Sequence, residues 1–339
     1  MSIKQWVTRR WYGKPGVLRL LLPLELLYTA CARRRRQRYA EHPERRYRSP
    51  LPVIIVGNIS VGGTGKSPTV AWLVAHLRER GWQPGIASRG YGGRAESYPL
   101  LVESTTSPVQ AGDEPVMLRA LTGVPVAVAP QRAEAVRLLE AQGCSIIVTD
   151  DGLQHYALER DIELVVVDGE RGLGNGHCLP VGPLREPAAR LADADGVLVN
   201  GELRTGELPG AWSARLTPLH LRRLSDSARQ PLSPLPFAGK VHGVAGIGHP
   251  ERFFTALEAL GIEVIRHPFG DHHQFTQQDL DFGDQLPIVM TAKDAVKCQP
   301  LLSDTRRAFS WALDVALMPE AGFSDWLDGQ LESLSGAGE

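Results

Sequence analysis

Residues 53–67 read VIIVGNISVGGTGKS, and this stretch decides the fold. A short run of apolar, mostly β-branched residues at 53–56 predicts a strand that leads directly into a glycine-rich turn. Residues 69–80 then place apolar side chains at helical spacing, and Pro68 stands where a first helical turn tolerates proline. Strand, glycine-rich turn and helix form the context in which a Gly-Lys-Ser sequence binds phosphate.

The residues of this turn have distinct physical tasks. Glycines let backbone N–H groups surround phosphate oxygens, and the following helix N-terminus adds partial positive charge. We expect Lys66 to reach the β- and γ-phosphates and the Ser67 hydroxyl to hold Mg²⁺. Ser60 stands where the strict pattern has glycine, and a glycine-rich turn with an exposed lysine is the alternative interpretation. The expected nucleotide-binding residues are Ser60, Val61, Gly62, Gly63, Thr64, Gly65, Lys66 and Ser67.

Short apolar strands alternate with helical patterns along the rest of the chain, which indicates a parallel sheet covered on both faces. Residues 202–238 are rich in Pro, Arg and Leu and predict an irregular linker, after which a second α/β pattern runs from 241 to 291. The expected fold is α/β: a P-loop NTPase-type parallel-sheet domain and a second, smaller α/β domain, with an N-terminal amphipathic helix. The expected divisions are 1–48 (membrane-associating helix and basic segment), 49–205 (P-loop domain), 206–238 (linker) and 239–339 (second domain).

Two acids follow a predicted strand at 145–149. A parallel strand delivers the residue after its carboxyl end to the edge of the sheet where ligands bind. Phosphoryl transfer needs a carboxylate at such a position to fix the metal. Asp150 and Asp151 therefore predict a metal-side pair, with a turn or helix cap as the alternative, because Gly152 follows.

Candidates for positioning a phosphoryl acceptor and accepting its proton are less specific. They are Asp113 in the sequence Gly-Asp-Glu-Pro, His155, and the cluster Asp271-His272-His273. Each of these alone is more often structural than catalytic. A zinc site from His267, His272 and His273 lacks a clearly spaced fourth ligand.

Composition narrows the class of protein. The chain has 339 residues, of which 43% are hydrophobic and 22% charged, and these values exclude a disordered chain, a coiled coil and a multi-span membrane protein. The formal net charge is −1, but residues 1–50 hold thirteen Lys/Arg and three acids, so this segment is +10 and the remainder −11. A basic segment of this kind indicates an anionic partner, either nucleic acid or membrane.

Four separated cysteines (31, 144, 178 and 298), without a CxxC pair, favour a reducing compartment.

Residues 17–32 read VLRLLLPLELLYTACA and are followed by four arginines at 33–36. Arg19, Pro23 and Glu25 interrupt the apolar run, so it falls short of the roughly 20 apolar residues of a spanning helix. The pattern favours an interfacial amphipathic helix with arginines that attract anionic headgroups. The alternatives are a buried core helix followed by a solvated basic loop, or nucleic-acid binding, which the lack of interleaved aromatic residues disfavours. At helical spacing one arc holds Val17, Leu20, Leu21, Leu24, Leu27, Tyr28 and Cys31.

Eight ordered motifs resemble the tetraacyldisaccharide 4′-kinase family, the lipid A kinases of Gram-negative bacteria. In chain order they are IIVGNISVGGTGKSP, SRGYGGR, GDEP, TDDGLQH, LPVGPLRE, GIGHPERFF, DHHQF and TAKDAVK. The resemblance extends from the N-terminal hydrophobic segment to about residue 300. It implies transfer of the ATP γ-phosphate, with Mg²⁺, to the 4′-hydroxyl of a tetraacylated glucosamine disaccharide 1-phosphate. It also implies a peripheral or monotopic location at the cytoplasmic face of the inner membrane, and no nucleic-acid partner.

The resemblance assigns roles to individual residues. It places the acceptor-side aspartate at Asp113 and its histidine partner at His272, a pair that implies a general base. It associates Asp150 and Asp151 with the metal, adds Glu186 as a further metal-side carboxylate, and places His155 nearby in support. Arg89 and Tyr91 fall in the loop expected to meet the lipid sugar.

Two other functions remain open at this point. A P-loop ATPase switch recruited to membranes shares the P-loop, metal acids and lipid-binding segment, but has no need for Asp113 or His272. A soluble metabolite kinase with a merely solvated basic segment predicts full activity after deletion of residues 1–48. A kinase with its base and its nucleotide on different domains would need domain closure, and we expect a hinge around residues 202–238.

Overall fold

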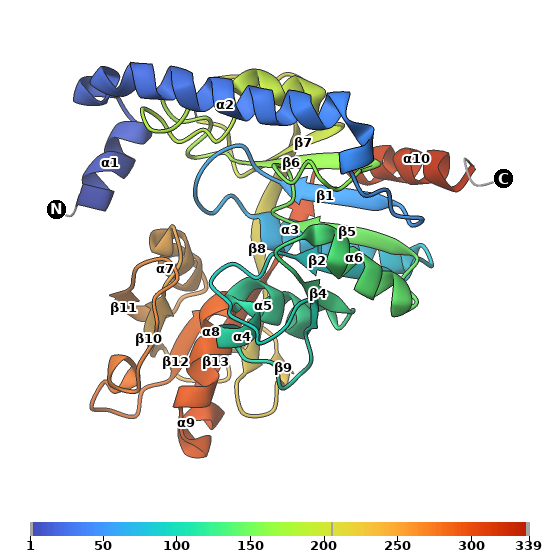
Figure 1. The fold of residues 1–339 in the computed structure, drawn as a ribbon. Helices are drawn as coiled ribbons and strands as arrows, with labels where there is room; N and C mark the ends of the chain where they lie inside the picture. Colours follow the sequence, from blue (N-terminus) through green and yellow to red (C-terminus); the bar gives the residue numbers. More distant parts are fainter. Residues whose placement is uncertain (1–2, 205, 337–339) are drawn as a thin grey trace. The chain divides into compact units, whose positions relative to one another are not determined.

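The computed structural model describes residues 3–204 and 206–336. By their internal contacts these residues divide into two compact units, each assembled from separate parts of the sequence (Figure 1). Unit 1 comprises the chain up to Arg89, Val124–Leu216, and the chain from Leu317 onward. Unit 2 comprises Gly90–Gly123 and Thr217–Ala316.

Unit 1 is built on a parallel sheet with the strand order β7-β6-β1-β5-β2-β4. Its strands are almost entirely buried, as expected for a parallel sheet covered on both faces. In the register, Val56 of β1 pairs with Asp150 of β5, so the carboxyl ends of these two strands meet at one edge. The strands are β1 (Val53–Gly57), β2 (Pro84–Ser88), β4 (Val126–Val128), β5 (Ile146–Asp150), β6 (Ile162–Asp168) and β7 (Gly196–Asn200).

Unit 1 also contains the helices α3 (Lys66–Glu79), α6 (Arg132–Ala141) and α10 (Phe323–Gly336). Val70, Leu73 and Leu77 of α3 are buried at helical spacing, which confirms the predicted helix. Helix α10 packs its Phe323 and Trp326 against Trp212, and its Asp328 contacts His76 of α3 at 2.9 Å. The C-terminal helix therefore belongs to the core of unit 1.

The N-terminal segment of unit 1 consists of α1 (Ile3–Trp11), a 3₁₀ helix η1 (Gly16–Leu21) and α2 (Leu22–Glu41). The sequence predicts one helix over 17–32, whereas α2 begins at Leu22, with Pro23 in its first turn, and continues through all four arginines. Proline has no N–H to donate, so it fits the first turn of a helix and not its interior. No helix in the described part of the chain is long and apolar enough to cross a membrane.

Helix α2 has one packed face and one exposed face. On the packed face Glu25 accepts from the Cys178 backbone N–H at 2.8 Å and contacts His177 at 2.9 Å, and Arg36 binds Asp193. Tyr28, which the helical arc places among the apolar residues, lies on this packed face and is half-buried. The exposed face of η1 and α2 carries large apolar side chains, which we call the leucine stripe: Val17, Leu20, Leu22, Leu24, Leu26 and Leu27.

Unit 2 contains a parallel sheet with the order β11-β10-β12-β13, where β13 enters unit 1 at its far end. Helices α5 (Asp113–Thr122) and α8 (Ala292–Cys298) pack against each other beside this sheet, although their sequences lie far apart. The short helix α4 (Pro108–Ala111) precedes α5, and α7 (Pro250–Ala259) buries Phe254 against β10. The strands are β10 (Lys240–Ala245), β11 (Glu263–Pro268), β12 (Ile288–Thr291) and β13 (Ser310–Pro319).

The P-loop-type α/β fold with a second α/β unit is confirmed, but the chain is divided differently from the linear expectation. Residues 90–123 fold with unit 2, because α5 packs on α8. The segment expected to be an irregular linker contains β8 (Trp212–Arg223), which pairs with β7 at its start and with β9 (Arg229–Gln230) near its end. The sequence does not predict strand β8, because Pro218 and the arginines within it interrupt the apolar pattern that is typical of a strand.

Candidate active site

The glycine-rich turn leaves the carboxyl end of β1 and enters α3 at Lys66. Gly62 and Gly65 have φ values of +112° and +97°, which side-chain-bearing residues rarely adopt. A Cβ on Gly65 would also lie 2.5 Å from the Asn200 side-chain amide, which donates to the Thr64 carbonyl at 3.2 Å. The turn is therefore held from the end of β7, and its shape requires glycine.

Lys66 and Asp151 lie together at the ends of β1 and β5, with 3.5 Å between the Lys66 Nζ and the Asp151 Oδ1. Arg185 Nη1 donates to both Asp151 oxygens at 3.2 Å. Burial alone would raise the pKa of Asp151, but the charges of Lys66 and Arg185 outweigh it and hold that pKa below its ordinary value. Asp150 is buried beside it at the end of β5.

Glu186 is buried in a different set of contacts. Its Oε2 accepts from the Tyr156 hydroxyl at 2.6 Å and lies 3.5 Å from Arg190 Nε. Its Oε1 is buried and has no hydrogen-bond partner among the described residues. Of the neighbours Arg185 and Glu186, Arg185 is the residue whose side chain reaches Asp151, and the sequence motifs assign it no role.

His155 supports the same region through the backbone. Its Nε2 accepts from the Arg132 backbone N–H at 3.3 Å, at the start of α6. Burial, reinforced by the charges of Arg132 and Arg160, lowers the pKa of His155 to about 4, so the ring is neutral at neutral pH. A neutral imidazole can accept this hydrogen bond, whereas an imidazolium cannot.

Arg132 is a second residue of this region whose role no sequence pattern indicates. Its guanidinium is buried and donates to the carbonyl of Asp150 at 3.1 Å. Burial lowers the pKa of Arg132 to about 10, so the group stays charged at neutral pH. Arg132 is the first residue of α6, which follows β4 in the chain. It reaches the end of β5 only because β4 pairs with β2, and β2 with β5, in the parallel sheet.

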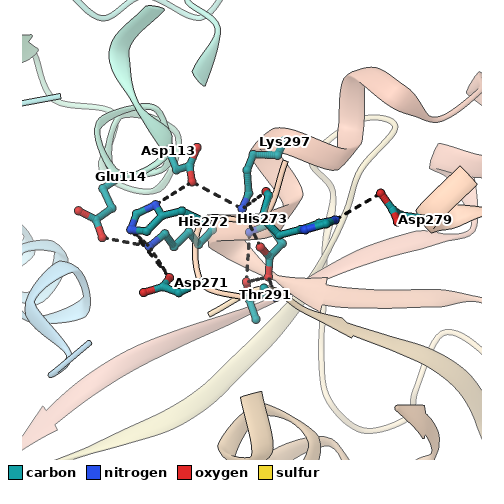
Figure 2. Close-up of polar contacts among 11 residues, drawn as sticks. Asp113, Glu114, Asp271, His272, His273, Asp279, Thr291 and Lys297 are labelled. Atoms are coloured by element: carbon teal, nitrogen blue, oxygen red, sulfur yellow. Dashed lines mark hydrogen bonds and ion pairs between the residues drawn. The ribbon is translucent and has the colours of Figure 1, made fainter. Parts of the chain in front are cut away.

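Asp113 and His272 meet within unit 2. Asp113 is the first residue of α5, and its Oδ2 lies 3.4 Å from His272 Nδ1 and 3.5 Å from Lys297 Nζ (Figure 2). Gly112 before it has a φ of +90°, and a Cβ there would lie 2.6 Å from the Tyr91 carbonyl oxygen. The Tyr91 ring in turn contacts the His272 ring, with 5.4 Å between their centroids.

Two lysines of α8, Lys293 and Lys297, lie beside this pair, and the sequence alone assigns neither of them a role. Lys297 is almost fully buried and contacts the buried Asp294 at 3.0 Å. Lys293 lies within 3.2 Å of Glu114 and 3.4 Å of Asp271. Burial alone would raise the pKa of Asp113, but the His272 hydrogen bond and the charges of Lys297 and Lys293 outweigh it and hold that pKa below its ordinary value. In the sequence, only the spacing of Lys293, Asp294 and Lys297 within one helical turn could have indicated this cluster of charges.

The remaining sequence candidates are placed as follows. Arg89 is exposed directly after β2 in unit 1, and Tyr91 is exposed in unit 2. His267 pairs with His242 at 2.9 Å, and His273 contacts Asp279. Among the described residues no group of three or more His, Cys, Asp or Glu side chains is arranged to hold a metal ion, so the zinc interpretation has no support.

The neutral His155 predicts a specific pH dependence of stability. Its pKa is about 4 in the folded chain and has a model value of 6.5, so the unfolded chain binds more protons between these values. The wild type should lose stability as pH falls from about 6.5 to about 4, by roughly 1 kcal/mol per pH unit at most. His155→Gln should lack this component in urea unfolding at pH 7 and pH 5. An equal pH dependence in both proteins would contradict the buried neutral ring.

Comparison with known proteins identifies the family. The family model for tetraacyldisaccharide-1-P 4′-kinase, LpxK, matches residues 17–332. A tetraacyldisaccharide 4′-kinase of Alkalilimnicola ehrlichii is 51% identical over 326 residues, 96% of either chain, and one of Pseudomonas putida is 45% identical over 335 residues, 98% of either chain. The crystal structure of LpxK from Aquifex aeolicus in complex with ATP is similar with a TM-score of 0.76 and 27% identity, covering 93% of this chain and 99% of that one. Matched along nearly its whole length, the chain belongs to the tetraacyldisaccharide 4′-kinase family.

Proposed function

We propose that this protein transfers the γ-phosphate of ATP to the 4′-hydroxyl of a tetraacylated glucosamine disaccharide 1-phosphate, a step of lipid A biosynthesis. The observation that carries the proposal is the buried Asp113 held by His272 and Lys297, in a chain that also has a P-loop. An ATPase switch needs the P-loop but has no use for a carboxylate prepared for an acceptor hydroxyl. The family membership favours the kinase over that switch.

On the acceptor side Asp113 acts as the general base. A bond forms between the 4′-oxygen and the γ-phosphorus, the bond from that phosphorus to the β-phosphate oxygen breaks, and the hydroxyl proton passes to the Asp113 carboxylate. Its lowered pKa keeps Asp113 ionised throughout the neutral range. His272 Nδ1 and Lys297 Nζ both face the Asp113 Oδ2, so they fix the orientation of the carboxylate. Tyr91, against the His272 ring, and Arg89 are the proposed contacts to the lipid sugar.

On the nucleotide side the backbone of residues 60–67 surrounds the phosphates, and Lys66 supplies a positive charge beside them. Lys66 and Arg185 both form ion pairs with Asp151. Asp151 therefore holds these two cationic side chains at the proposed phosphate end of the site. Arg132 fixes the backbone of Asp150 and thereby the end of β5. His155, as a neutral acceptor, contributes by holding the start of α6.

The donor set suits Mg²⁺. The proposed hard oxygen ligands are the Ser67 hydroxyl, Asp150 and Asp151, with Glu186, whose buried Oε1 has no hydrogen-bond partner among the described residues, as a further carboxylate. In the described part of the chain these carboxylates do not form a ready-made group of three that could hold a metal ion. Mg²⁺ is commonly held by one or two carboxylates together with water and substrate phosphates, so a complete protein cage is not needed. When bound, the ion would neutralise charge on the transferring phosphoryl group.

The N-terminal segment provides the proposed contact with an anionic membrane surface, at the cytoplasmic face of the inner membrane. Leu20, Leu26 and Leu27 of the leucine stripe are each more than 60% exposed, which is costly in water and favourable at a lipid interface. The arginines at 33–35, also exposed, continue the same helix and suit anionic headgroups. Such a location presents the enzyme to a substrate that itself carries acyl chains.

The deciding experiment is direct turnover. Purified protein is incubated in detergent with labelled ATP and the tetraacyldisaccharide 1-phosphate, and bis-phosphorylated lipid is measured. Absence of product from wild-type protein that binds ATP would refute the proposed activity.

Variants separate the two sides of the reaction. Asp113→Ala should lower kcat by about 10²- to 10⁴-fold and leave ATP affinity unchanged, because it removes the base only. Lys66→Met should weaken ATP binding as well as turnover. Asp226→Ala, an exposed acid of unit 2 paired with Arg223, is the matched control and should retain activity.

Lys297 predicts a shift in the pH profile. The His272 hydrogen bond and the charges of Lys297 and Lys293 lower the pKa of Asp113, so Lys297→Met should raise that pKa. The acidic limb of kcat/KM should then move to higher pH, since the base must be ionised. A lowered activity with an unmoved acidic limb would show that Lys297 does not act on Asp113.

The leucine stripe predicts membrane binding. Replacing Leu20, Leu24 and Leu27 together by Gln should reduce flotation with anionic phospholipid vesicles at least tenfold, and leave turnover of detergent-dispersed substrate less affected. Met318→Gln, an exposed apolar residue on β13, is the control. Undiminished flotation of the triple variant would exclude the stripe as the docking surface.

A further inference from the structure

The N-terminal segment touches the glycine-rich turn directly. The Tyr12 hydroxyl donates to the Val61 carbonyl at 3.1 Å, and Val61 belongs to the proposed phosphate-binding residues. The Trp11 indole donates to the Pro180 carbonyl at 3.0 Å, and the Trp11 carbonyl accepts from the Asn175 N–H at 2.8 Å. These flanking bonds hold Tyr12 in place against unit 1, so its contact with the turn does not stand alone.

Arg171 strengthens the same contact. Its guanidinium carbon lies 5.2 Å from the centre of the Tyr12 ring, an arrangement that attracts a cation to an aromatic face. A Cβ on Gly62 would lie 3.2 Å from Arg171 Nη1, which places the guanidinium directly beside the turn. Tyr12 therefore contacts the turn both through its hydroxyl and through the arginine that it stacks upon.

A second tyrosine reaches the other side of the site. The Tyr28 hydroxyl of α2 donates to the Arg185 carbonyl at 2.9 Å. The Arg185 side chain binds Asp151, and its backbone N–H donates to the Ile59 carbonyl, just before the turn. A displacement of Tyr28 would thus be transmitted through one residue to Asp151 and to the start of the turn.

Both hydroxyls are suited to this role. Burial raises the pKa of Tyr12 and of Tyr28, so each remains a protonated donor at neutral pH. The accepting atoms are main-chain carbonyls, so each bond constrains the backbone path and not merely a rotatable side chain. Tyr28 also lies on the helix whose opposite face carries the leucine stripe.

We propose that Tyr12 and Tyr28 are positioning residues through which the N-terminal segment sets the geometry of the phosphate-binding turn and of Arg185. The segment is then a structural part of the nucleotide site in addition to its proposed role in membrane docking. The inference rests on the proposed function in one respect, namely that residues 60–67 bind ATP.

The test uses the full-length protein with Tyr12→Phe, Tyr28→Phe and the double variant. Each substitution keeps the ring and removes one hydroxyl. We expect each single variant to raise the Kd for ATP, measured calorimetrically, and the KM for ATP by about three- to tenfold. The double variant should show a larger effect. The KM for the lipid in detergent should stay unchanged, because the acceptor-side groups are not touched.

Tyr47→Phe is the matched control. The Tyr47 hydroxyl donates to the Glu140 carboxylate at 3.0 Å, away from the turn, so Tyr47→Phe also removes one partly buried tyrosine hydrogen bond. Unchanged ATP affinity in both single variants and the double variant would overturn the inference, as would an equal loss in Tyr47→Phe. Wild-type protein that fails to bind ATP would instead refute the proposed function itself, so the two failures are distinguishable.

Discussion

The turn from β1 into α3 is the constraint on which the rest of the structure depends. We propose that its backbone presents N–H groups to phosphate, and its glycines at 62, 63 and 65 leave part of the loop without side chains to hold it in place. Gly62 and Gly65 provide the required left-handed conformations, and neighbouring groups supply the support that the loop lacks. Asn200 holds Thr64, Asn58 reaches the Gly62 carbonyl, and Tyr12 holds Val61. A glycine-rich loop of this kind is therefore only as well ordered as the residues packed around it.

Both chemically important aspartates depend on the same physical balance. Asp113 is buried and the Asp151 side chain is 35% exposed; burial disfavours the charge of each carboxylate, and nearby cations restore it. The cations come from distant parts of the sequence, Lys297 for Asp113 and Arg185 for Asp151. The result is two ionised carboxylates at neutral pH, one in each unit, with fixed orientation.

Helix α2 of the N-terminal segment has one face packed on unit 1 and one face exposed to solvent. Its packed face carries Glu25 and Tyr28, which bond to the backbone of residues 178 and 185, whereas its other face exposes the leucine stripe. Helical periodicity anticipates two faces, but it assigns Tyr28 to the apolar one. Burial of an aromatic side chain with a hydroxyl is favourable when the hydroxyl finds an acceptor, and the Arg185 carbonyl is that acceptor.

The sequence by itself determined the fold class, the position of the glycine-rich turn, most strands of unit 1 and the family, because these are encoded in local patterns. Buried strands are short apolar runs, and the turn requires glycines at particular positions. The Asp113–His272 assignment came from the family's motifs, and no local pattern reveals it, since 159 residues separate the two. Only the tertiary structure decided that residues 90–123 fold with unit 2 and that β8 runs through the expected linker. It also brought Arg132, Arg185 and the α8 lysines to the aspartates, Tyr12 to the glycine-rich turn and Tyr28 to Arg185. The physical reason is the same in each case. Packing between distant segments decides which groups surround a buried charge or carbonyl, and the residue pattern within one segment does not predict that packing.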